Sequence, residues 1–112
     1  MARHQKSVSR QSREAIELLG RMIRAARLER NMTAMDLAAR AGVSRPLLAR
    51  VENGDPRVGI GSVFEIAAIV GVPLLGDRPD DVSKSLSAER RYHSVLRQRA
   101  FQAQNRKVND DF

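Results

Sequence analysis

The stretch from Thr33 to Gly54, TAMDLAARAGVSRPLLARVENG, decides the fold of this chain. Thr33 predicts the start of a short helix, because its hydroxyl can accept a hydrogen bond from the free N–H groups of a first turn. Gly42 predicts the end of that helix, since glycine adopts without strain the left-handed backbone that closes a helix. Ser44 can then cap a second helix, so the stretch has the pattern of a helix-turn-helix.

Apolar residues in this stretch are spaced as two packed helices require. Ala38 lies four residues before Gly42 and leaves room for the second helix, while Leu48 and Val51 lie six and nine residues after that glycine. In a helix-turn-helix the second helix enters the major groove of DNA. A helical hairpin that binds nothing is the alternative. The positions predicted to face outward from the second helix are Arg45, Pro46, Leu47 and Arg50.

The composition is compatible with a DNA-binding protein. The 112 residues carry a formal net charge of +7, which favours a polyanionic partner, although a merely soluble, charged surface has the same balance. Cysteine is absent, which excludes disulfides and thiolate metal sites, and no apolar run approaches the roughly 18 residues of a membrane helix. We therefore expect a cytoplasmic, nucleoid-associated protein with no metal, no cofactor and no membrane contact.

Three parts of the chain differ in composition. Residues 1–13 contain four lysines and arginines, no acid and almost nothing apolar, which predicts a disordered basic N-terminal arm; contact of this arm with DNA is the second possibility. Residues 14–76 have the apolar periodicity expected of a folded, DNA-binding domain. Residues 77–112 form a basic tail, either disordered or helical over about residues 87–107, that we expect to bind a partner.

The predicted domain is all-α, a compact bundle of four to five helices. One helix is expected over residues 14–30 and another over residues 60–70, on either side of the helix-turn-helix. The second of these is apolar on nearly every face. This indicates either a homodimer contact or a helix that only covers the core of its own domain. Pro73 predicts a short extended segment after it. The residues expected at the dimer interface are Phe64, Val72, Leu74 and Leu75.

These features resemble the phage-repressor helix-turn-helix, the lambda-repressor/Cro superfamily of XRE-type regulators. The similarity covers about residues 19–72 and includes the glycine turn and the sequence VENG at residues 51–54. It implies a lambda-repressor-like fold and a double-stranded DNA operator as partner. For each arginine a phosphate contact is the alternative to reading a base. The positions that correspond to base-facing residues are Arg45, Pro46, Leu47 and Arg50.

The same resemblance implies roles for residues around the second helix. Arg27 and Glu52 correspond to an internal salt bridge, and Ala34 stands where the family often has a glutamine that contacts DNA. Pro46 departs from the family, because proline disfavours helical backbone at the preceding residue; the helix then begins at Pro46 with Arg45 as its cap. The positions that contact the DNA backbone are Thr33, Ser44 and Asn53.

The segment after Val51 narrows the resemblance. The sequence ENGDP at residues 52–56, followed by an apolar helix with Phe64, is similar to the HipB antitoxins of HipA-type kinase toxins. This implies a homodimer that represses its own operon, a kinase toxin as partner, and a C-terminal tail that docks on the toxin with Phe112 as its aromatic anchor. The alternatives are a stand-alone XRE-family regulator without a toxin, and an interaction module whose basic tail binds a partner.

No enzyme is expected. His4 and His93 lie outside the predicted domain, so neither a metal pair nor a histidine base for Ser44 is within reach. The glycines after the helix-turn-helix lack the Lys-Ser/Thr pair of a phosphate-binding loop.

Overall fold

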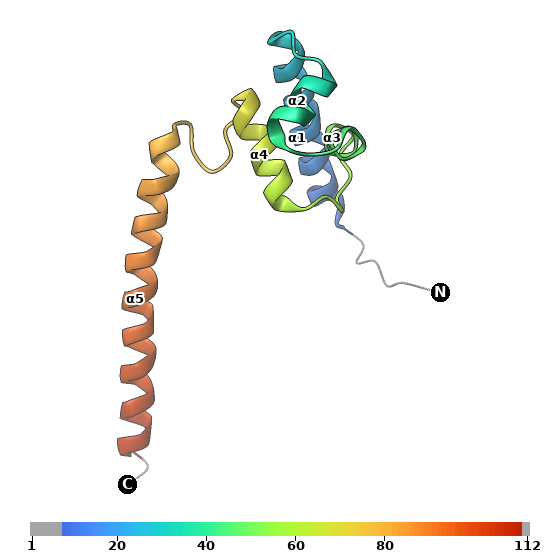
Figure 1. The fold of residues 1–112 in the computed structure, drawn as a ribbon. Coiled ribbons are helices and arrows are strands. Elements are labelled where there is room, and N and C mark those ends of the chain that lie inside the picture. The colour runs from blue at the N-terminus through green and yellow to red at the C-terminus, as the bar shows by residue number, and fades with distance from the viewer. Residues whose placement is uncertain (1–7, 111–112) are drawn as a thin grey trace. The chain divides into compact units, whose positions relative to one another are not determined.

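The computed structural model describes residues 8–110, with side chains described up to residue 108, and within these residues it is all-α (Figure 1). This confirms the predicted fold class. The chain divides into two compact units, one ending at Leu74 and the other beginning at Leu75. The first unit contains α1 (Arg10–Glu29), α2 (Ala34–Ala41), α3 (Arg45–Glu52) and α4 (Ile60–Val70), and the second contains α5 (Pro79–Asp110).

Helix α1 begins earlier than the sequence predicted. Ser9 caps it by accepting a hydrogen bond from the backbone N–H of Ser12 at 3.2 Å, so residues 10–13 are helical and not part of a disordered arm. Residues 1–7 of the expected arm lie outside the described residues. The helix ends before Asn31, whose φ of 55° is a left-handed conformation that asparagine tolerates better than most residues.

The caps of the helix-turn-helix follow from local sequence. The Thr33 hydroxyl accepts from the Asp36 N–H at 3.0 Å, and the Asp36 carboxylate accepts from the Thr33 N–H at 3.4 Å, which forms a capping box. Gly42 ends α2 with φ of 67°, as predicted. Ser44 accepts from the N–H of Leu47 at 3.2 Å and α3 begins at Arg45, so the alternative in which Arg45 caps a helix starting at Pro46 is wrong.

The core of the first unit draws one or more residues from each of its four helices. The fully buried side chains are Ile23, Leu37, Leu48, Ile66 and Val70. Helix α4 has the predicted bounds and packs against α1 and α2. Val72, which was predicted at a dimer interface, is 8% exposed and packs in this core. The expected extended segment turns at Leu75, where φ is 66°.

Helix α5 is longer than the predicted helix over residues 87–107. Its first turn holds Pro79, which needs no hydrogen-bond acceptor for its nitrogen, and two acids that oppose the positive end of the helix dipole. The carboxylate of Asp81 also accepts from the Arg78 N–H at 3.0 Å. Every described side chain from residue 82 to residue 108 is exposed. None of the helices in the described range has the length and apolar character required to span a membrane.

Candidate nucleic-acid interface

One side of α3 is exposed at the surface of the domain. Leu48 and Val51 point into the core, and Leu47 is half-buried at its edge. The exposed residues recur at the spacing of one helix face, and they are Arg45, Pro46, Ala49, Arg50 and Asn53. Ala49 was missed by the sequence analysis, which considered only large side chains. Its small side chain lies between the two arginines in sequence, so it leaves room for a close approach to this face.

The two arginines of this face have their hydrogen-bonding groups available. Within the described residues, the guanidinium of neither Arg45 nor Arg50 donates a hydrogen bond to a side chain or carbonyl. A guanidinium has five N–H donors in a planar fork, and this fork matches the O6 and N7 acceptors of guanine in the major groove. The face is therefore chemically suited to a base edge or a phosphate.

The three residues expected to contact phosphates lie at helix ends. Thr33 and Ser44 cap α2 and α3, and each hydroxyl oxygen already accepts a backbone N–H. The hydroxyl proton is not used by such a cap and can be donated to an external acceptor. Asn53 is the C-terminal cap residue of α3, and its side chain is exposed.

A buried ion pair joins the end of α3 to α1. Arg27 Nε donates to Glu52 Oε2 at 2.8 Å and Arg27 Nη2 donates to Oε1 at 2.9 Å, while Nη1 donates to the Met32 carbonyl at 3.1 Å. The side chains of the pair are 11% and 9% exposed. The hydrogen bonds that Arg27 donates to Glu52 raise the pKa of Arg27 above its ordinary value, against the opposing effect of burial. The pair is thus a structural link and not a free reading group.

Comparison with known families gives the same picture of this unit. The family model of the helix-turn-helix matches residues 23–76. This segment is an XRE-type helix-turn-helix domain. It has the lambda-repressor-like all-α fold and is a DNA-binding domain of the kind found in transcription regulators. No curated protein matches the chain.

Two glycines allow α1 to touch the end of the recognition helix α3. A Cβ atom on Gly20 would lie 2.5 Å from the Val51 carbonyl oxygen and 2.8 Å from that of Glu52. A Cβ atom on Gly54, where φ is 75°, would lie 3.0 Å from the Cα of Glu17. The sequence analysis did not single out Gly20, although a glycine inside an amphipathic helix costs about 1 kcal/mol relative to alanine and so indicates a packing reason.

The loop after α3 holds a second ion pair. Arg57 donates from Nε to Asp55 Oδ1 at 3.0 Å and from Nη2 to Oδ2 at 3.1 Å, and its backbone N–H donates to Oδ1 at 2.9 Å. These bonds, together with the charge of Arg50, lower the pKa of the Asp55 carboxyl. These bonds hold the Arg57 guanidinium against Asp55 in the loop that follows α3.

We expect the pKa of Asp55, measured by NMR titration, to lie below the ordinary aspartate value and to rise in Arg57→Gln. Because the folded-state pKa is the lower one, the loop contact is complete at neutral pH and is lost as the pH falls through that value. An Asp55 pKa that does not move in Arg57→Gln would contradict the ion pair.

The structure describes all of the remaining predicted site residues except Phe112. Phe64 is 37% exposed on α4, Leu74 is half-buried against the core, and Leu75 is 77% exposed. Ile60 on α4, which was not named as an interface residue, is 73% exposed. Phe112, the expected anchor for a toxin, lies outside the described residues. Among the residues that are described, no cluster of histidine and carboxylate side chains could hold a metal ion.

Proposed function

We propose that this protein is a sequence-specific repressor of transcription that reads a double-stranded operator with α3. The observation that carries the proposal is the exposed face of α3, with two arginine side chains that form no hydrogen bond or ion pair with a described residue. Arg45 and Arg50 read guanines, and Pro46 and the half-buried Leu47 contact thymine methyl groups. Thr33, Ser44 and Asn53 donate hydrogen bonds to phosphates on either side and thereby set the register of the helix on the duplex.

We further propose that the repressor acts as a homodimer. The large apolar side chains of Ile60 and Phe64 on α4, and of Leu75, remain exposed in the single chain, and burial of apolar surface is the usual source of dimer stability. In a two-fold dimer the two copies of α3 meet half-sites about 34 Å apart, one turn of the double helix. The operator is therefore expected to be a palindrome.

Selection from a random duplex library, followed by titration at two salt concentrations, tests this function. We expect enrichment of a palindrome, binding of two protomers per site, and a preference over a scrambled duplex that persists at the higher salt. Equal affinity for both duplexes that disappears with salt would mean that only the positive charge binds. Binding of a single protomer to a non-palindromic site would support the proposed regulator and contradict the proposed homodimer.

Replacing Arg50 with alanine separates base reading from phosphate binding. We expect the variant to lose about 1–3 kcal/mol of discrimination at one base pair of each half-site, because the bidentate contact with guanine is removed. Repeating the selection with the variant identifies that position by its relaxed consensus. An unchanged consensus with uniformly weaker binding would assign Arg50 to a phosphate.

We also propose that the protein is the antitoxin of a HipA-type kinase. The support is the similarity of residues 52–64 to HipB antitoxins and the long helix α5, whose described side chains from residue 82 onward are all exposed. Co-purification with a kinase encoded beside this gene, compared between the full chain and a variant ending at Gly76, tests it. Loss of the kinase with retained operator affinity supports a toxin-binding tail. Absence of any such kinase gene would contradict the antitoxin proposal and support a stand-alone regulator.

A further inference from the structure

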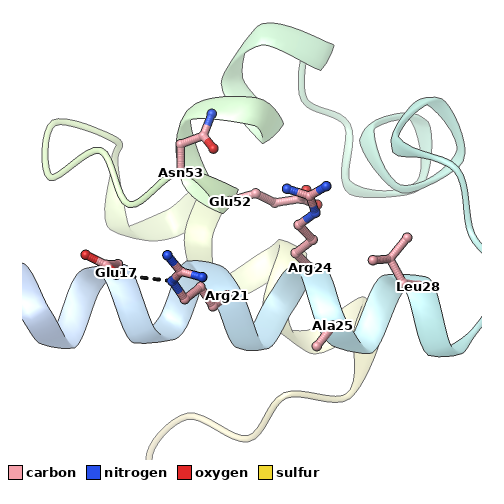
Figure 2. Close-up of a pocket in the computed structure, with 7 residues that line it drawn as sticks. All are labelled: Glu17, Arg21, Arg24, Ala25, Leu28, Glu52 and Asn53. Atoms are coloured by element: carbon pink, nitrogen blue, oxygen red, sulfur yellow. Dashed lines mark hydrogen bonds and ion pairs between the residues drawn. The ribbon is translucent and has the colours of Figure 1, made fainter.

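A groove lies beside the C-terminal end of α3, outside the residues assigned above to base reading. Its floor and one wall come from α1, and the other wall comes from the last turn of α3 (Figure 2). Its volume is about 490 Å³, and Asn53 stands on its rim. Because Asn53 also belongs to the exposed face of α3, the groove continues the surface that meets DNA.

Some charged side chains of the groove form ion pairs within the domain, and one does not. Glu52 is occupied on both oxygens by Arg27, at 2.8 and 2.9 Å. Glu17 accepts a hydrogen bond from Arg21 Nε at 3.1 Å, and a dashed line marks this bond in Figure 2. Arg24 also lines the groove, and neither an ion pair nor a hydrogen bond links its side chain to any residue between 8 and 108.

We propose that this groove binds a backbone phosphate of the operator, an inference that rests on the DNA-binding function proposed above. Arg24 supplies the main cation, and the Asn53 amide supplies a neutral donor at the rim of the groove. Guanidinium groups bind phosphate oxygens with short, charge-assisted hydrogen bonds, and phosphate contacts make up half or more of protein–DNA hydrogen bonds. Glu17 weakens the site by holding Arg21 and by repelling the phosphate.

The position of the groove favours DNA over a free anion. The phosphate strands border the major groove, so with α3 docked there we expect a strand to pass the groove between the end of α3 and α1. A free phosphate ion would meet one unengaged arginine and the carboxylate of Glu17, without the additional contacts that hold a duplex in place. The site is therefore expected to act only when α3 is docked.

The first test measures the affinity of Arg24→Gln for the selected operator and for a scrambled duplex over a range of salt. We expect roughly tenfold weaker binding to both duplexes, and a salt slope reduced by about one unit, because one phosphate contact is lost. Arg30→Gln is the matched control. Arg30 is also exposed, but it donates to the Ala26 carbonyl and lies against Gly71 at the end of α4, away from the groove.

The second test uses a variant that is expected to strengthen DNA binding. Glu17→Gln is expected to strengthen binding to both duplexes, because it removes a negative charge and releases Arg21. Glu29→Gln removes the same charge from an exposed position near the end of α1 that does not line the groove, and its effect should be smaller. Equal melting temperatures of all four variants and the parent protein would show that the changes in affinity are not caused by unfolding.

The outcomes distinguish the groove from the function on which it rests. If the parent protein does not prefer the operator, the proposed function is wrong and the groove has no ligand. If the parent prefers the operator but Arg24→Gln behaves as Arg30→Gln does, the groove proposal alone is wrong. If inorganic phosphate by itself raises the melting temperature of the parent and not of Arg24→Gln, the site takes a free anion, which overturns the assignment to DNA.

Discussion

Replacing Arg27 with alanine is expected to lower the free energy of unfolding by about 3–5 kcal/mol, the usual result of leaving one member of a buried ion pair without its partner. Glu52 is 9% exposed and would lose both of the hydrogen bonds that its carboxylate accepts from Arg27. The Met32 carbonyl would lose its donor as well. Urea denaturation gives the value directly, and a loss of this size is a large share of the stability of a small domain.

The double variant Arg27→Met, Glu52→Leu tests the cause of that loss. With both charges removed, the penalty for an unpaired carboxylate disappears, and apolar replacements of buried pairs are often neutral or stabilising. We expect most of the stability to return, with a remaining deficit from the unsatisfied Met32 carbonyl. A double variant as unstable as Arg27→Ala would show that packing of the arginine stem, and not the buried charge, determines the effect.

The second large effect is expected for Gly20→Ala. The added methyl group would lie 2.5 Å from one backbone carbonyl oxygen of α3 and 2.8 Å from the next, and backbone atoms cannot move aside as the end of a flexible side chain can. Helices α1 and α3 must separate, so we expect a loss of about 3 kcal/mol, the upper end for a methyl group forced into a packed interior. Denaturation with urea measures it.

Gly61→Ala is the matched control for this prediction. Gly61 lies in the first turn of α4, its φ is not positive, and nothing would lie within 4 Å of an added Cβ atom. Alanine there should be neutral or should stabilise the domain by about 0.4–1 kcal/mol, because it restricts the unfolded chain. Equal denaturation midpoints for the two variants would contradict the close approach of α1 and α3. A folded fraction of Gly20→Ala should also bind the operator more weakly, since α3 is displaced.

Much of the candidate site could be predicted because it depends on local backbone chemistry. Thr33 and Ser44 cap helices wherever they precede a helical segment, and Gly42 and Gly71 end helices because only glycine adopts the left-handed conformation without strain. The bounds of α2 and α4 and the outward face of α3 therefore followed from residue types and spacing. The early starts of α1 and α5 accompany two hydrogen bonds that the sequence analysis did not consider. The Ser9 hydroxyl accepts from the Ser12 N–H, and the Asp81 carboxylate, inside the first turn of α5, accepts from the Arg78 N–H.

The sequence by itself determined that this chain contains a helix-turn-helix with two exposed arginines on its second helix, because caps, glycine turns and apolar periodicity act over a few residues. Only the tertiary structure decided which residues pack inside the domain and which line its surface groove. Val72 is drawn into the core, Gly20 is the point where two backbones meet, and Arg24 lines a groove beside Asn53. These roles depend on which segments distant in sequence pack together, and residue types alone do not specify that packing.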